Sequence, residues 1–314
     1  MDVIVVGAGS LGSLVGGLLA REHAVTLVGR EAQVAAIEAD GLTISGAIDA
    51  TVHPSAAIEP PASADLALVT VKAYDTEDAA RTLASTSLDA ALSLQNGLGN
   101  EATLAANLDC PVLAGTCTYG ARLLEPGHVE CTGVGDVVLG PRAGGTLERA
   151  DAVGVAFDRA GIDTTVAADM PQRLWEKLAV NAAINPITAL ARVPNGALAD
   201  GPAATVAHQA ARETARVARA HGIDLSDRDA VAATDRVVAD TAANHSSMLQ
   251  DVERERRTEI DAISGAVVER ASSAAAADDD SGTQASGEDV GVAAPVNGTL
   301  AALVSAWEAQ RNLR

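Results

Sequence analysis

Two lysines and a pair of side-chain amides have the types and spacing needed for chemistry on an oxygen anion. Lys72 and Lys177 are the only lysines in the chain, which has twenty arginines. Lys177, Asn181 and Asn185 recur at intervals of four residues, so a helix predicted over 173–190 places all three on one face. A partly desolvated lysine has a lowered pKa and can protonate such an anion. The alternative is a solvated helix face, where so acidic a chain would more often carry Asp or Glu.

A second group of polar residues follows two apolar runs. Lys72 comes after the run at 66–71, and Asn96 comes after the run at 91–94. Ligands of open α/β sheets bind beyond the carboxyl ends of the strands, so both side chains are expected to face one crevice, with Gly97 allowing close approach. The alternative for Lys72 is a surface position at the end of a strand.

Two further positions lie late in the chain. Ser246 and Ser247 precede a helix predicted over 251–270, and one of them either caps this helix or binds a carboxylate. Glu259 has apolar neighbours on that predicted helix. It either holds Lys177 in its charged form or makes a surface ion pair with a neighbouring arginine.

The segment GAGSLG fits the pattern Gly-x-Gly-x-x-Gly between a predicted strand and a predicted helix. The first glycine permits a tight turn, the second lets the backbone approach a pyrophosphate, and the third lets the helix pack closely on the strand. A glycine-rich turn of another α/β fold is the alternative. The residues expected to contact a dinucleotide here are Gly7, Ala8, Gly9, Ser10, Leu11 and Gly12.

The end of the second predicted strand bears on the choice of nicotinamide. Enzymes that use NAD place an acid there for the ribose 2′-hydroxyl, whereas this chain has Gly29 followed by Arg30. A guanidinium suits a 2′-phosphate, so the cofactor is predicted to be NADP(H). A surface pair between Arg30 and Glu31 is the alternative. Lys72 and Asn96 are also expected to contact the cofactor.

The elements that must position these residues divide the chain into two predicted domains, 1–168 and 169–314. In the first, apolar runs alternate with helical stretches, which is typical of a doubly wound parallel sheet of the Rossmann type. The glycine-punctuated stretch 117–140 favours antiparallel hairpins. The second domain is expected to be all-helical. Strands are expected at 3–6, 24–28, 66–71, 91–94, 111–116 and 163–166, and late helices at 173–190, 203–221, 227–242, 251–270 and 295–307.

The composition limits the partners. The net charge is −20 and the pI about 4.5, so nucleic acid and anionic membranes are poor partners. An acidic chain poor in lysine resembles proteins of salt-in halophiles, and a GC-rich genome is the alternative explanation. Because aromatic residues make up only 2%, the core must be built from Ala, Val, Leu and Ile.

The remaining features indicate a cytoplasmic globular protein. Cys110, Cys117 and Cys131 are an odd number without a Cys-x-x-Cys spacing, which favours buried free thiols in a reducing compartment, and no metal site is expected. No apolar run is long enough to span a membrane, and no basic segment typical of a signal peptide precedes the first strand. The acidic stretch 274–289 is expected to be a solvated, mobile loop.

Seven separated motifs together resemble the ketopantoate reductases over nearly the whole chain. The resemblance implies a helical C-terminal domain like that of 6-phosphogluconate dehydrogenase and reduction of 2-dehydropantoate to (R)-pantoate, on the route to pantothenate and coenzyme A. It also implies that Lys177 is the general acid. Ser264 departs from the family, which often has Asn there. The motifs are GAGSLG, Val71-Lys72-Ala73, residues 95–99, residues 174–190 with Asn195-Gly196, NHSSMLQD at 244–251, TEID at 258–261, and Pro295-Val296-Asn297. The substrate-binding residues that we expect are Lys72, Asn96, Asn181, Asn185, Asn195, Asn244, Ser247 and Glu259.

Two other functions stay open from the sequence. One is a related NADP-dependent reductase of another 2-keto acid, which would share the fold and Lys177. The other is a non-catalytic NADP(H)-binding regulator, which the presence of Lys177 and Asn96 disfavours. The partner is expected to be a small 2-keto acid, and the chain a monomer or a homodimer.

Overall fold

The computed structural model describes residues 1–279 and 292–314. The chain forms two compact units. The first comprises Met1–Gln95 and Gly99–Pro171, and the second comprises Asn96–Leu98 and Gln172–Arg314. The short segment 96–98, which carries one of the expected site residues, therefore belongs to the second unit although its neighbours in sequence belong to the first.

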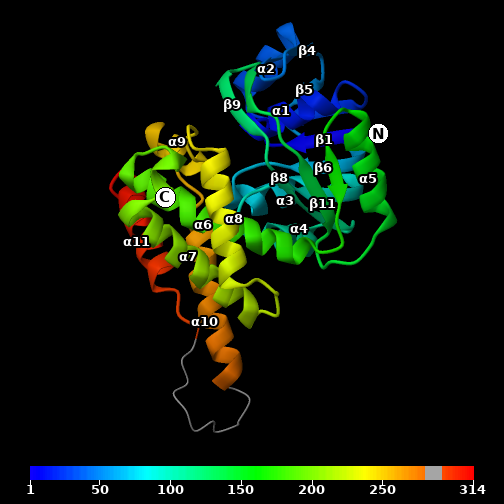
Figure 1. Cartoon of the computed structure of the whole chain (residues 1–314). Coiled ribbons are helices and arrows are strands. Elements are labelled where there is room, and N and C mark those ends of the chain that lie inside the picture. Colours follow the sequence, from blue (N-terminus) through cyan, green and yellow to red (C-terminus); the bar gives the residue numbers. More distant parts are fainter. Residues whose placement is uncertain (280–291) are drawn as a thin grey trace. The chain divides into compact units, whose positions relative to one another are not determined.

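An eight-stranded sheet forms the centre of the first unit, in the order β12-β11-β8-β7-β6-β1-β2-β5. Neighbouring strands are parallel except where β11 runs antiparallel to β8, which confirms the predicted α/β fold. Figure 1 shows β1, β6, β8 and β11 within this unit. The strands are β1 (Asp2–Val6), β2 (Ala24–Val28), β5 (Ser55–Ala57), β6 (Ser63–Val69), β7 (Ser87–Ser93), β8 (Val112–Cys117), β11 (Val137–Pro141) and β12 (Thr164–Val166).

Both faces of this sheet are buried, because successive residues of its central strands point to opposite faces and are apolar on both. Val3 and Val5 of β1 pack in one core with the helices α1 (Ser10–Leu19) and α5 (Glu148–Arg159). Ile4 and Val6 pack on the opposite side, in a core that includes side chains of two other helices. Those helices are α3 (Thr76–Leu83) and α4 (Asn100–Asn107), while α2 spans Glu31–Asp40.

A second, four-stranded sheet has the order β4-β3-β10-β9. Its antiparallel hairpin of β9 (Gly120–Glu125) and β10 (His128–Gly133) confirms the hairpins predicted within 117–140. The strands β3 (Leu42–Gly46) and β4 (Ala50–Val52) were not predicted. They are short and partly exposed, and β3 is fixed by pairing with the distant strand β10, which no local pattern reveals.

The second unit is helical, as predicted. Its core consists largely of alanine, valine, leucine and isoleucine side chains, with Trp175 as the aromatic residue in the buried cluster. None of the described helices is long and apolar enough to cross a membrane. The helices are α6 (Met170–Ala191), α7 (Gly201–Ala220), α8 (Asp227–Asp240), α9 (Ser247–Glu253), α10 (Ala266–Asp279) and α11 (Pro295–Ala309).

Three predicted boundaries are wrong. No single helix covers 251–270: α9 ends at Glu253, and a π-helical turn, η3 (Asp261–Gly265), precedes α10. The strand β6 ends at Val69, so Lys72 follows it by three residues and is the N-cap residue of a short 3₁₀ turn, η1 (Ala73–Asp75). The helix α10 continues to Asp279, so the first residues of the predicted acidic loop are helical; its part at 280–289 lies outside the described residues.

Candidate functional site

The glycine loop of the first unit has the backbone geometry that its motif predicts. Gly7 has φ +105°, and a Cβ there would lie 2.7 Å from the backbone nitrogen of Val71. A Cβ on Gly12 would overlap the carbonyl oxygen of Gly7. Packing therefore explains these two glycines. A Cβ on Gly9 would meet only the Gly7 oxygen, at 4.0 Å, so Gly9 faces open space that a ligand can enter.

The same loop leads into the N-terminus of α1, which is suited to an anion. Gly9 is the N-cap residue, no side chain caps the helix, and its first turn carries no acid. Ser10 uses its hydroxyl oxygen to accept a hydrogen bond from the Leu123 N–H at 3.0 Å, which ties strand β9 to the loop. Free N–H groups and the helix dipole at such a terminus favour a phosphate.

Gly29 at the end of β2 has a steric cause. A Cβ at this position would lie 2.8 Å from the Cβ of Ala8, so the strand end approaches the glycine loop too closely for a side chain. Arg30 follows as the exposed N-cap residue of α2, and the exposed Glu31 begins the helix. A cationic residue therefore directly follows the strand end that approaches the loop, where enzymes that use NAD place an acid for a ribose hydroxyl.

Gln95, which was not among the predicted site residues, organises the segment that carries Lys72. Its amide nitrogen donates to the carbonyl oxygen of Val71 at 3.0 Å and to the hydroxyl of Thr76 at 2.7 Å. The Thr76 hydroxyl donates in turn to Asn100 at 2.9 Å. Lys72 itself is half-buried. This buried network fixes the backbone on both sides of Lys72 relative to the end of β7.

The polar residues on one face of α6 become more buried towards the end of the helix. Lys177 and Asn181 are half-buried, and Asn185 is 5% exposed. The amide of Asn185 lies 3.5 Å from the hydroxyl of Ser247, which is exposed. α6 continues through Pro186 to Ala191. These side chains give the helical unit a row of hydrogen-bonding groups that begins with an ammonium.

The structure decides between the two serines at the start of α9. Ser246 is buried and caps the helix by accepting from the N–H of Leu249 at 3.1 Å. Its hydroxyl also pairs with that of Thr188 at 2.7 Å. Ser247, with its side chain outside this cap, is the serine available to a ligand.

Asn96 and Glu259 lie together in the helical unit. The Asn96 amide donates to the Glu259 carboxylate at 3.2 Å, and Glu259 is 5% exposed. Gly97 has φ +85°, and a Cβ there would overlap the carbonyl oxygen of Ala262. Glu259 precedes the π-helical turn instead of lying on a helix, and its side chain is buried.

Asn195 and Asn244 meet through the backbone. The N–H of Asn195 donates to the Asn244 carbonyl at 3.0 Å. The Asn195 side chain is buried and donates to the hydroxyl of Thr241 at 2.9 Å, while the Asn244 side chain is exposed. Asn195 thus joins the loop after α6 to the loop after α8.

Burial shifts the pKa of three titratable groups of the first unit. Burial raises the pKa of the Cys110 and Cys131 thiols and of the Tyr119 hydroxyl. The cysteines form no disulfide, but only Cys131 is buried; Cys110 and Cys117 are half-buried, which corrects part of the prediction. Within the described ranges, no three His, Cys, Asp or Glu side chains gather as metal ligands would.

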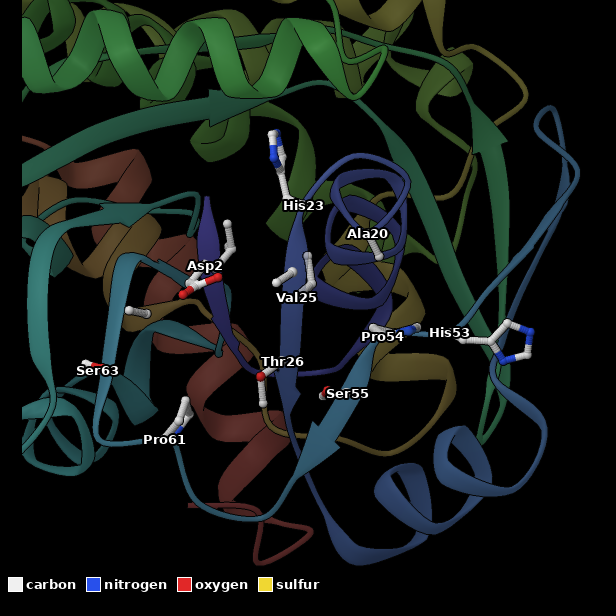
Figure 2. Close-up of a pocket in the computed structure, with 13 residues that line it drawn as sticks. Asp2, Ala20, His23, Val25, Thr26, His53, Pro54, Ser55, Pro61 and Ser63 are labelled. Carbon is white, nitrogen blue, oxygen red and sulfur yellow. The ribbon is translucent and has the colours of Figure 1, made fainter.

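A depression of about 310 Å³ lies in the first unit at the amino ends of several strands of the large sheet (Figure 2). Its walls include Asp2, Ala24, Ser55 and Ser63, which are the first residues of their strands. The glycine loop follows the carboxyl end of β1. The depression is therefore separate from the candidate dinucleotide site.

Comparisons with known proteins agree with this geometry. The family model "Ketopantoate reductase PanE/ApbA" matches residues 3–144, and its C-terminal counterpart matches residues 169–308. A 2-dehydropantoate 2-reductase of Halobacterium salinarum is 43% identical over 97% of this chain and 98% of its own, which supports the expected likeness to halophile proteins. One from Archaeoglobus fulgidus is 39% identical over 98% and 97%. The crystal structure of a PanE/ApbA family ketopantoate reductase from Ralstonia eutropha has a TM-score of 0.87, with 33% identity over 99% of this chain and 100% of that one.

Proposed function

The chain belongs to the ketopantoate reductase family PanE/ApbA, and on this basis we propose that it reduces 2-dehydropantoate to (R)-pantoate with NADPH. The observation that carries the proposal is the polar row on α6, in which the ammonium of Lys177 precedes the amides of Asn181 and Asn185. The proposed reaction adds a hydride to C2 of the keto acid and a proton to its carbonyl oxygen.

The glycine loop supports binding of a dinucleotide. The open side of Gly9 and the uncapped N-terminus of α1 fit a pyrophosphate. The exposed Arg30 fits a ribose 2′-phosphate, which favours NADPH over NADH. When bound, the nicotinamide supplies the hydride. In this proposal Gly7–Gly12, Arg30, Lys72 and Asn96 hold the cofactor.

Lys177 is the general acid in this proposal. Negative charge develops on the carbonyl oxygen as the hydride adds, and an ammonium within hydrogen-bond reach stabilises that charge and then donates its proton. No other side chain of the polar row on α6 carries a proton that it can donate at neutral pH, because Asn181 and Asn185 end in amides.

The other polar groups bind and select the substrate in this proposal. The amides of Asn181 and Asn185 and the Ser247 hydroxyl suit a carboxylate or a hydroxyl, and the Glu259 carboxylate suits a hydroxyl. A site built to hydrogen-bond a substrate hydroxyl rejects an analogue that lacks it, because its buried polar groups are then left without partners. Lys72, Asn96, Asn195 and Asn244 complete the proposed substrate-binding set.

A panel of 2-keto acids tests this function. We expect oxidation of NADPH to be fastest with 2-dehydropantoate and to fall strongly with an analogue that lacks the hydroxyl. Chiral analysis of the product is expected to give (R)-pantoate. If a different keto acid gave the highest kcat/KM, the protein would still be a reductase, but the proposed substrate would be wrong.

Three remaining features stay predictions. The domain boundaries 1–168 and 169–314, the monomeric or homodimeric state and the cytoplasmic location follow from the sequence and the family. Light scattering coupled to gel filtration in molar KCl measures the oligomeric state directly. A trimer or larger assembly would contradict that prediction.

A further inference from the structure

A fully buried carboxylate lies near the end of α11. Glu308 is 0% exposed, and its Oε1 accepts hydrogen bonds from both the N–H and the hydroxyl of Thr258, at 2.7 and 2.6 Å. Its Oε2 accepts from the Nε of Arg314 at 3.0 Å. A buried charge is costly unless it is paired and hydrogen-bonded, and these three donors meet that requirement.

The partner of this carboxylate is the residue directly before Glu259. Thr258 is 2% exposed, and its hydroxyl oxygen also accepts from the N–H of Ile260 at 3.3 Å. The residues on both sides of Glu259 are thus tied to Glu308, one directly and one through the threonine hydroxyl. The Glu259 side chain in turn accepts from Asn96.

Arg314 connects Glu308 to the π-helical turn. We call the contacts of Glu308 with Thr258 and Arg314 the clamp. The guanidinium of Arg314 donates to Glu308 and also to the Asp261 carboxylate at 2.9 Å. Asp261 is the first residue of that turn, which follows Glu259 by two residues. Single π-turns are frequent at functional sites, because they redirect side chains locally.

We propose that Glu308 is a positioning residue, which acts through Thr258 and Arg314 to fix the carboxylate of Glu259. This inference rests on the proposed function, in which Glu259 binds the substrate. Glu308 touches no substrate in this account. Its effect comes from geometry, since a displacement of about 1 Å in a binding group can reduce a rate about a hundredfold.

The test is a matched pair of variants, Thr258→Val and Thr258→Ser. Valine has the shape of threonine without the hydroxyl, so it removes the hydroxyl bonds to Glu308 and Ile260 and leaves the bond from the N–H of residue 258 to Glu308. We expect kcat/KM for 2-dehydropantoate to fall at least about tenfold in the valine variant and to recover in the serine variant. We expect the Kd for NADPH to stay unchanged in both, which a general loss of structure would not permit.

Thr234→Val is the control. Thr234 is 1% exposed in the same unit, and its hydroxyl donates only within α8, to the carbonyl of Ala230 at 2.9 Å. This variant measures how much kcat/KM changes when one buried hydroxyl hydrogen bond that does not involve Glu308 is removed. We expect its kcat/KM to match that of the unmodified protein.

Amide hydrogen exchange of residues 256–262 distinguishes failure of the positioning role from failure of the proposed function. Faster exchange in Thr258→Val, with kcat/KM lost and restored by serine, supports the proposal. Full activity in Thr258→Val, or unchanged exchange, overturns the positioning role. If the unmodified protein does not reduce 2-dehydropantoate, the proposed function fails, and the positioning role for that substrate fails with it; the exchange data then still report whether the clamp exists.

Discussion

The Asn96 amide donates a hydrogen bond to the Glu259 carboxylate, across 163 residues of sequence. Both residues belong to the helical unit, and Glu259 is buried there. This hydrogen bond restricts the orientation of both side chains. In the proposed reaction this pair contributes to substrate binding, and its two members are expected to depend on each other.

Glu259→Gln and Glu259→Ala test the pair. Glutamine keeps an oxygen that can accept from Asn96 but removes the charge, so we expect kcat/KM to fall about tenfold; alanine leaves the amide without its acceptor, and we expect a larger loss. Steady-state kinetics with 2-dehydropantoate measure both. Equal activity of the alanine variant and the unmodified protein would rule out a role for Glu259.

Lys177→Ala is expected to lower kcat by about 10²- to 10⁴-fold, because the developing oxygen anion loses its proton donor. NADPH binding, measured by fluorescence titration, is expected to stay intact. Lys177→Arg is the matched control, since arginine keeps the charge but does not release its proton. A kcat within a few fold of the original value in the alanine variant would exclude Lys177 as the acid.

Arg30→Ala is expected to weaken NADPH binding by about tenfold to a hundredfold, which corresponds to one lost hydrogen bond to a charged group. The affinity for NADH is expected to change little. Arg81→Ala removes an exposed arginine that pairs with Asp78 on α3, and it serves as the control for charge alone. Equal losses for both cofactors would contradict the 2′-phosphate assignment.

The raised thiol pKa values predict slow alkylation of the cysteines that carry them. Burial favours the neutral thiol at Cys110 and Cys131, and only the thiolate is nucleophilic. At neutral pH these two thiols are therefore protonated, and their reactivity is expected to rise only as the pH exceeds the ordinary thiol value. Mass spectrometry after timed iodoacetamide treatment measures each site, with the denatured chain as the control. Fast labelling of Cys131 at neutral pH would contradict its burial.

The net charge of −20 predicts that salt stabilises the fold. At 1 M salt the Debye length is about 3 Å, which screens repulsion between surface carboxylates. We expect Tm to rise with KCl by about 2–4 °C for each kcal/mol of repulsion removed. An osmotically matched sucrose series shows how much exclusion of a solute from the protein surface contributes to Tm without added charge. A Tm that is flat or falls with KCl would exclude a role for charge repulsion.

Features with a local cause could be predicted from the sequence. The glycine loop at 7–12 follows from a short pattern between a strand and a helix, and the row Lys177, Asn181, Asn185 follows from helical periodicity. The alternation of strands and helices identified the sheet. In each case the determining residues are neighbours in sequence.

Features fixed by distant partners could not be predicted. The helix expected over 251–270 is interrupted after Glu253, and Thr258 in the interruption bonds to Glu308, fifty residues further on. Gln95 lies in the motif at 95–99, but its role depends on its hydrogen bonds to Val71 and Thr76. The choice between Ser246 and Ser247 needed the observed cap. A polar side chain next to a site residue, as in Thr258-Glu259, is the one local signal that could have pointed to such support.

The most direct test of the central claim is the stoichiometry of one reaction. Purified protein in molar KCl is mixed with 2-dehydropantoate and NADPH, and both NADPH loss and pantoate formation are followed, with NADH in a parallel sample. The account predicts rapid turnover with NADPH, one pantoate formed for each NADPH consumed, and slower turnover with NADH. Absence of pantoate in a folded sample that binds NADPH would contradict it.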